Sequence, residues 1–219
     1  MVAGCALRST DAGQTTGVKR GGCSCAGLGH RDECDGIHVR QRAAIPATTG
    51  SQCNNKLVEV FLHDSKGSGV QSYLPFNYPD YVYYRDHTKS LEGLMAFEGD
   101  GTEAIWNHAG AGEIVHGQLV SGNLFQFTGV KALAGRTLSV GDDRIDNPRQ
   151  VVVLSYPFWK QKLGGDPGVV GKSLMLDGAE FMMSGVAPDG FTGLMVGNAP
   201  DFWAPLTTLR LFSHGGRTG

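Results

Sequence analysis

Glycine interrupts this chain so often that a bundle of long helices is not a fold open to it. The 219 residues include 33 glycines, about twice the usual share of roughly 7%, and each glycine inside a helix costs about 1 kcal/mol relative to alanine. The apolar residues fall into short runs, none of which reaches the ~18 residues that a membrane-spanning helix needs. The sequence therefore predicts short strands and helices joined by turns, in a chain long enough to bury a core.

The clearest predicted strand covers residues 150–154 (Gln-Val-Val-Val-Leu). A short apolar run of this kind is typical of a strand that is buried on both faces. Ser155 follows as a helix cap, with a proline in the first helical turn. Phe158 and Trp159 give this helix an apolar side, and the glycine pair 164–165 ends it.

The remaining elements are predicted from the same signals. Asp177-Gly178 favours a tight hairpin turn, because both residues of such a turn need a positive φ. Leu91, Leu94 and Met95 recur at helical spacing, which indicates a short helix. The predicted strands are 57–61, 113–120, 173–176, 179–183 and 202–203, and the predicted helices are 77–88 (capped by Asn77), 90–96 and 124–128 (ended by Gly129). Strands and helices in this order predict an α+β fold with several short βαβ-like steps.

Charge and cysteine divide the chain near residue 55. Residues 1–55 carry six Lys/Arg, four Asp/Glu and all five cysteines. Residues 56–219 carry thirteen Lys/Arg, seventeen Asp/Glu and no cysteine. Residues 1–55 show no sustained period of 2 or 3.6, so we expect a disordered or atypical leader there, and residues 207–219 form a polar tail. The net charge of −2 indicates that nucleic acid is not a partner.

A cluster of metal-ligand residue types lies in this leader: Cys23, Cys25, His30, Cys34 and His38. Zinc takes four such ligands in a tetrahedron. The Cys-x-Cys spacing is tighter than the usual gap of two to four residues, and no apolar residues surround it. The sequence therefore favours a chance cluster over a zinc site, and no metal ligand is predicted.

Two other motifs are better explained by structure than by chemistry. Gly171-Lys172-Ser173 has the ending of a phosphate-binding loop, but position 166 is Asp where the motif needs glycine, and a strand rather than a helix is predicted to follow. The aromatic run 156–159 could stack on a ligand, yet its helical spacing beside Leu163 indicates core packing. We expect a turn entering a strand at the first motif and core at the second.

The remaining polar residues do not form a recognisable catalytic set. Asp142, Asp143 and Asp146 lack the spacing of a calcium loop, so a solvated loop is expected. His116 alternates with apolar neighbours in its strand and is expected to face solvent. The sequence holds neither His-Glu-x-x-His nor Gly-x-Ser-x-Gly. No catalytic and no cofactor-binding residue is therefore predicted.

Several strings along residues 56–206 together resemble one family. They are Tyr78-Pro79-Asp80-Tyr81, Tyr84-Arg85-Asp86, Ser90-Leu91-Glu92-Gly93-Leu94, Gly117-Gln118-Leu119-Val120-Ser121-Gly122-Asn123-Leu124-Phe125, Gly135-Arg136-Thr137-Leu138, Val153-Leu154-Ser155-Tyr156-Pro157-Phe158-Trp159, Gly164-Gly165-Asp166-Pro167 and Val186-Ala187-Pro188. In their order and spacing they resemble the MacB-like periplasmic core domain of ABC-type permeases. The related proteins are the macrolide exporter and the FtsX-like permeases, and above all the large permeases with a duplicated half.

The resemblance implies a domain on the periplasmic side of the cell membrane, between the first two transmembrane helices of a permease. It implies a porter-like βαβ subdomain at about 56–130 and a smaller mixed α/β subdomain with a β-hairpin at 131–206. A cytoplasmic ABC ATPase, the transmembrane helices of the permease and a periplasmic adaptor protein are the implied partners. The domain would couple ATP hydrolysis to export or to conformational change without catalytic residues of its own.

The sequence departs from the family at both ends of this region. The family has an apolar membrane helix before the position of Lys56, where this chain has its cysteine-rich leader, and it continues past residues 202–206. We therefore expect an incomplete domain with an unpaired sheet edge, which favours self-association. A free-standing periplasmic binding or adaptor module and a small hydrolase stay open as alternatives.

Overall fold

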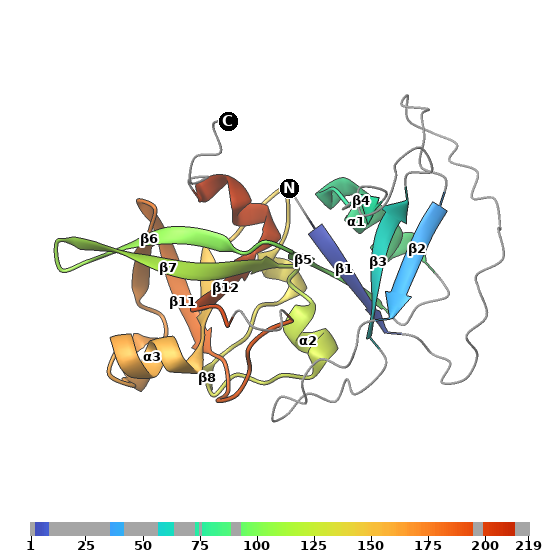
Figure 1. Cartoon of the computed structure of the whole chain (residues 1–219). Helices are drawn as coiled ribbons and strands as arrows, with labels where there is room; N and C mark the ends of the chain where they lie inside the picture. Colours follow the sequence, from blue (N-terminus) through green and yellow to red (C-terminus); the bar gives the residue numbers. More distant parts are fainter. Residues whose placement is uncertain are drawn as a thin grey trace.

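The computed structural model describes residues 3–8, 36–41, 57–63, 73–74, 76–88, 93–194 and 199–212. Figure 1 shows their arrangement. The strands are β1 (Ala3–Arg8), β2 (Gly36–Gln41), β3 (Leu57–His63), β4 (Tyr73–Leu74), β5 (Gly93–Glu98), β6 (Thr102–His108), β7 (Ala111–Val120), β8 (Ala134–Gly135), β9 (Val151–Leu154), β10 (Ser173–Leu176), β11 (Ala179–Val186) and β12 (Phe202–Pro205).

The helices are short, as the glycine content predicts. None of the described helices has the length and apolar character needed to span a bilayer. They are the α-helices α1 (Tyr78–His87), α2 (Leu124–Thr128) and α3 (Tyr156–Lys162), and the 3-10 helices η2 (Val140–Asp142), η3 (Pro167–Val169) and η4 (Leu206–Leu211).

Local sequence signals set the ends of these elements as predicted. The Asn77 side chain accepts a hydrogen bond from the Asp80 N–H at 2.8 Å, and the Ser155 side chain accepts one from the Phe158 N–H at 3.3 Å. Asp177 and Gly178 take φ values of 49° and 78° in the turn between β10 and β11, so the predicted hairpin is confirmed.

Six strands close into a ring in the order β12-β9-β11-β10-β6-β7, because β7 pairs again with β12. The β9–β11 and β7–β12 pairs are parallel and the others are antiparallel. Closure removes the free edges that a ladder of this length would otherwise expose. β12 has a neighbour on each side, so the unpaired edge expected from the sequence does not fall at this strand.

Two apolar clusters lie on opposite faces of the ring strands. One cluster contains Val152 and Leu154 of β9, together with Phe202 of β12, and the other contains Val151 and Val153. Successive side chains of a strand point to opposite faces, so β9 is buried on both faces as its apolar run predicts.

β5 joins the ring to the other strands. It pairs with β7 at a single register pair, Phe97 with Val120, and with β1 along its whole length. β1 then pairs with β3, and β3 with β2 and β4. Figure 1 shows the ring on one side of β5 and the group of β1, β3, β2 and α1 on the other.

The helix predicted at residues 90–96 is wrong, because residues 93–98 form strand β5. Leu94 and Ala96 lie in one apolar cluster, and Met95 and Phe97 lie in the other. A strand buried on both faces is a continuous apolar run, which periodicity alone does not separate from a buried helix. Residues 89–92 lie outside the described residues.

The strand pairing bears on two expected domain limits, which stay predictions. β1 and β2 fall within residues 1–55, where a disordered or atypical leader is expected, and β1 takes part in the sheet through its backbone pairs with β3 and β5. β6, which the sequence did not suggest, and β7 pair with β10 and β12. The strand ladder is therefore continuous across the boundary expected at about residue 130.

Candidate functional site

Hydrogen bonds between side chains and backbone connect α1, β5 and the ring at one junction. The backbone contributes little there, because β5 and β7 share one register pair. The Ser121 N–H also donates to the Ala96 carbonyl at 2.7 Å, and the Ala96 N–H donates to the Ser121 hydroxyl at 2.9 Å. Side chains supply the remaining polar contacts.

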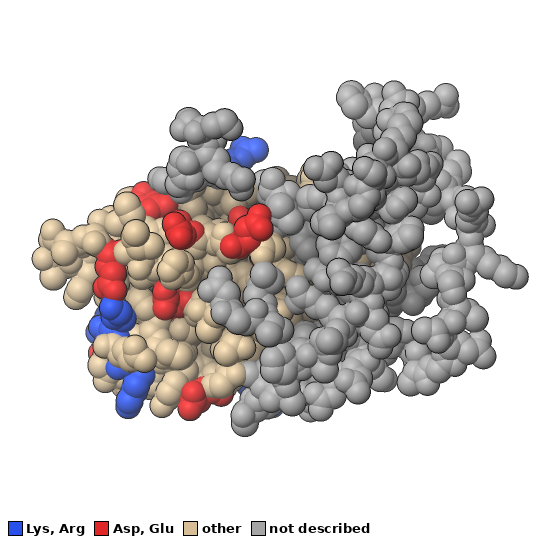
Figure 2. All heavy atoms as spheres, viewed as in Figure 1, with Lys and Arg blue, Asp and Glu red and all other residues tan. Residues whose placement is uncertain are grey.

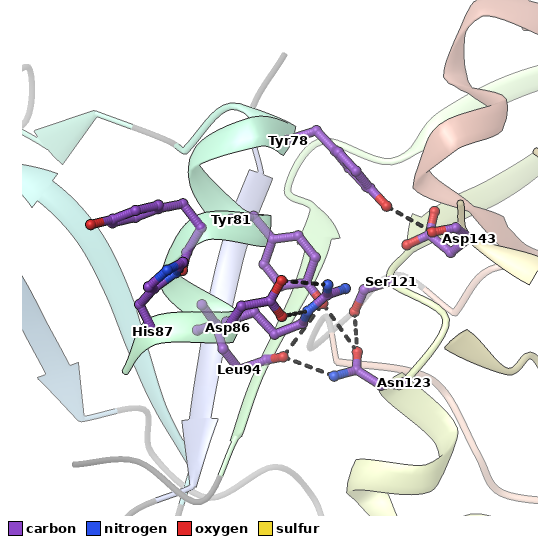
Figure 3. A network of polar contacts seen from close by, with 10 residues as sticks. Tyr78, Tyr81, Asp86, His87, Leu94, Ser121, Asn123 and Asp143 are labelled. Atoms are coloured by element: carbon purple, nitrogen blue, oxygen red, sulfur yellow. Dashed lines mark hydrogen bonds and ion pairs between the residues drawn. The ribbon is translucent and has the colours of Figure 1, made fainter. Parts of the chain in front are cut away.

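Asn123, in the turn after β7, connects three elements. Its Nδ2 donates to the Leu94 carbonyl of β5 at 2.8 Å, and its Oδ1 accepts from the Ser121 hydroxyl at 2.6 Å. The buried Tyr81 hydroxyl of α1 lies 3.3 Å from the same Oδ1 and 3.4 Å from the Leu94 carbonyl. Figure 3 shows Tyr81 and Ser121 converging on Asn123. One amide thus ties the helix, the strand and the turn together.

Asp143 forms a second connection at this junction (Figure 3). Its backbone carbonyl accepts a hydrogen bond from the Tyr78 hydroxyl of α1 at 2.8 Å. Its carboxylate accepts from the Gly122 N–H at 3.2 Å and from the Thr207 N–H of η4 at 3.0 Å. Asp143 therefore holds α1, the turn after β7 and η4 at one point.

Burial governs the electrostatics of this connection. Removal from water raises the pKa of Asp143 above its ordinary value, although the N–H groups of Thr207 and Gly122 work in the opposite direction. Burial, followed by the charge of Asp143, also raises the pKa of Tyr78. Tyr78 thus stays a neutral hydrogen-bond donor, and Asp143 loses its proton at a higher pH than an ordinary aspartate does.

The preceding residue, Asp142, lies in a different environment. Its carboxylate accepts two hydrogen bonds from Arg136, at 2.6 and 2.9 Å, and two from the backbone and hydroxyl of Ser139. Burial alone would raise the pKa of Asp142, but the Arg136 and Ser139 hydrogen bonds outweigh it and the pKa lies below its ordinary value. The pKa values of these two neighbouring carboxyl groups are thus shifted in opposite directions.

Comparison with known proteins identifies the family to which this architecture belongs. The profile of the MacB-like periplasmic core domain matches residues 42–218. The chain belongs to this family. The match is wider than residues 56–206, over which the resemblance was predicted, and domains of this family are the extracytoplasmic part of membrane permeases of the ABC type. No curated protein matches the chain at a significant level.

Solved structures of low identity are similar to this MacB-like domain. The periplasmic region of MacB from Actinobacillus actinomycetemcomitans has 19% identity and a TM-score of 0.49, with 66% of this chain and 64% of that chain covered. The extracellular domain of the noncanonic ABC-type transporter YknZ from Gram-positive bacteria has 12% identity and a TM-score of 0.48, with 62% and 65% covered. The chain thus spans less than two thirds of either structure.

The structure corrects one prediction about acidic residues in this MacB-like domain. Asp142 and Asp143 do not lie in a solvated loop, because their exposed fractions are 1% and 5%. Asp146 is exposed and pairs with Arg144 at 2.7 Å. Both buried aspartates receive enough hydrogen bonds to offset part of the loss of water.

Other candidate residues lie where the sequence predicted. Ser173 begins β10 after Gly171, whose φ is +86°, which confirms a turn entering a strand. Phe158 and Trp159 are buried in the core. The side chain of His116 is exposed, as its alternation with apolar neighbours indicates.

The predicted chance cluster of cysteines and histidines is not placed by the structure. Cys23, Cys25, His30 and Cys34 lie outside the described residues, and only the backbone of His38, in β2, is described. Within the described part of the chain, no group of three or more His, Cys, Asp or Glu residues is positioned to hold a metal ion. On the face drawn in Figure 2, acidic side chains of the described residues are spread over the surface, and most of the basic side chains lie at its lower left.

The sequence held a signal for part of the junction. Ser139-Val140-Gly141-Asp142 matches the Ser-x-x-Asp pattern of a capping box, and the structure has both of its reciprocal hydrogen bonds. Ser121 and Asn123 belong to a string that carries the family resemblance, but only a strand end was expected there. No local signal marks Asp143, because its partners Gly122 and Thr207 are distant in the chain.

Proposed function

We propose that this MacB-like domain transmits conformational change between the transmembrane helices of an ABC-type permease and the periplasm. A cytoplasmic ATPase partner would supply the energy through ATP hydrolysis, and export or the engagement of a periplasmic adaptor would use the movement. In this proposal the domain holds no reacting group and acts by changing the relation between its parts.

The observation that carries this proposal is the narrow junction beside β5. The ladder between β5 and β7 has one register pair, and the polar contacts of Tyr81, Asn123 and Asp143 cross the same place. Domain movements of this kind use a few residues at element ends that absorb the change, while packed parts move as units. A junction with few backbone bonds and many side-chain bonds fits such a hinge.

We further propose that the domain has two moving parts, which modify the expected division into a porter-like region at about 56–130 and a smaller region at 131–206. The closed ring supports a rigid second part that also takes in β6 and β7, because these strands pair with β10 and β12. The moving first part then consists of α1 with β5 and the strands beyond it.

A reconstituted permease that contains this domain, together with its ATPase, tests the proposal through Asn123→Ala. Loss of the amide removes one hydrogen bond from the Leu94 carbonyl and one from the Ser121 hydroxyl, at a cost of about 0.5–1.5 kcal/mol for each bond. We expect ATP hydrolysis to continue while transport per ATP falls severalfold. Transport and ATP hydrolysis are measured in the same proteoliposomes.

Asn107→Ala is the matched control, because Asn107 is exposed near the tip of the β6–β7 hairpin, away from the junction. This control should leave the transport per ATP unchanged. The proposal would be contradicted if Asn123→Ala and Asn107→Ala had the same transport per ATP while circular dichroism showed both proteins to be folded.

A further inference from the structure

A shallow depression of about 560 Å³ opens on the ring surface next to the junction, since its lining residue Asp142 directly precedes Asp143. α2, the segment from β8 to η2, and the residue stretch before β9 each contribute to its wall. It is lined by Gln126, Arg136, Thr137, Leu138, Ser139, Gly141, Asp142 and Arg149. Two arginines and one aspartate give this lining a formal charge of +1.

Arg136 is held in a fixed orientation in this depression. The carboxylate of Asp142, with an exposed side-chain fraction of 1%, binds its guanidinium at 2.6 and 2.9 Å, and the Thr137 carbonyl accepts a third bond at 3.1 Å. A guanidinium has five N–H groups, so these bonds leave two of them for another acceptor. The side chain of Arg136 remains 45% exposed, so that acceptor can come from solution.

Arg149 is brought to the same place by its backbone. Its N–H donates to the carbonyl of Asp142 at 3.3 Å, so one residue fixes both arginines. The Arg149 side chain is exposed, and no ion pair of its guanidinium occurs among the described residues. Asp142 is the one acidic residue in the lining, and Arg136 and Ser139 already use its oxygens.

From this geometry we infer that Arg136, Arg149 and the Gln126 amide form a binding site for a phosphate-type oxyanion. Planar guanidinium groups match the paired oxygens of such an anion, and a pre-oriented arginine loses less freedom on binding. The buried Asp142 acts as the positioning residue for Arg136. This inference does not depend on the proposed coupling role.

The anion could be carried by a free phosphate compound or by a lipid headgroup. Val140, which lies in the sequence between the lining residues Ser139 and Gly141, is 47% exposed, so the segment that forms part of the lining also carries an exposed apolar residue. An anionic lipid presents a phosphate next to apolar chains. Both sources present a phosphate group, and the two kinds of probe described below distinguish them.

The full chain is titrated with inorganic phosphate at constant ionic strength, with binding followed by NMR chemical shifts. Its sedimentation with phosphatidylglycerol vesicles and with phosphatidylcholine vesicles is measured in parallel. We expect saturable binding of at least one anionic probe, and Arg149→Gln should weaken that binding about tenfold or more, as loss of a charge-assisted hydrogen bond implies.

Arg144→Gln is the matched control, since it removes the same charge from an exposed arginine, paired with Asp146, that does not line the depression. Binding of phosphate supports the site with a free anion as ligand, and binding of phosphatidylglycerol vesicles alone supports it with a lipid as ligand. Absence of saturable binding to either probe would overturn the inference. So would an equal loss of binding in Arg149→Gln and Arg144→Gln, because that result indicates diffuse attraction.

Discussion

At the scale of residues, Asp142 and Asp143 show how strongly partners decide the behaviour of a carboxylate. Asp142 is paired with a cation, whereas the side-chain hydrogen bonds of Asp143 come from the backbone N–H groups of Gly122 and Thr207. Asp143 therefore combines two favourable hydrogen bonds with an unfavourable burial of charge, and substitutions can separate these two effects.

Asp143→Ala should lower the free energy of unfolding by about 2–4 kcal/mol, because two buried N–H groups lose their acceptor. Asp143→Asn keeps one acceptor oxygen and should cost less. Because the pKa of Asp143 is raised in the fold, the native state binds more protons than the unfolded state above the ordinary pKa. Its contribution to stability is thus full at low pH and is lost as the pH rises through the folded pKa.

Urea denaturation of the wild type and Asp143→Asn between pH 3.5 and pH 7 measures this effect. The stability of the wild type relative to Asp143→Asn should fall as the pH rises. The contribution of Asp142, which has the opposite sign, is common to both proteins and cancels in the difference. A relative stability that rises with pH would refute the assignment.

Gln118 offers a second prediction at this scale. Gln118 is 2% exposed, and neither its side-chain nitrogen nor its side-chain oxygen has a hydrogen-bond partner among the residues that the structure describes. Replacement of a buried, unpaired polar group by an apolar group of similar shape is neutral or stabilising. Gln118→Met should therefore leave the melting temperature unchanged or raise it, and Gln118→Glu should lower it by burying a charge. Thermal melts of both variants test this, and a marked loss in Gln118→Met would show that the amide is needed.

At the scale of elements, Gly122 lets two segments approach closely at the junction. A Cβ at this position would lie 2.2 Å from the Ser139 carbonyl oxygen and 2.7 Å from its carbon. The obstacle is backbone and not a flexible side chain, so the turn after β7 and the segment before η2 would have to separate.

Gly122→Ala should accordingly cost about 1–3 kcal/mol of stability, the usual range for overpacking. Gly141→Ala is the control, because its Cβ would meet no non-neighbouring atom nearer than the Ser139 hydroxyl at 3.8 Å. Chemical denaturation of both proteins gives the comparison. Equal stability of the two variants would mean that the junction can open without cost.

The elements that the sequence predicted well are those with local signals. The caps Asn77 and Ser155 and the Asp177-Gly178 turn act within a few residues, so their structures follow from neighbours in the chain. β5 and β6 have no such signals, and their state depends on pairing with β7 and β10, which only the folded sheet provides. Asp143 was missed for the same reason.

At the scale of the whole molecule, the family resemblance predicted more of the fold than the local sequence patterns did. The order and spacing of its strings predicted a MacB-like periplasmic core domain, which the match over residues 42–218 confirms. The class of mixed sheet and helices was predicted from the succession of short elements. The closure of six strands into a ring was not predicted, because it depends on contacts between β7 and β12 that are distant in sequence.

That closure has a consequence for biosynthesis. β12 pairs with both β7 and β9, and it is the last of the ring strands in the chain. Because domains of this family lie outside the cytoplasm, the other five strands have two uncovered edges until residues 202–205 have also crossed the membrane. Nascent chains with open strand edges are vulnerable to aggregation, so the period before β12 docks is when this domain most needs a chaperone.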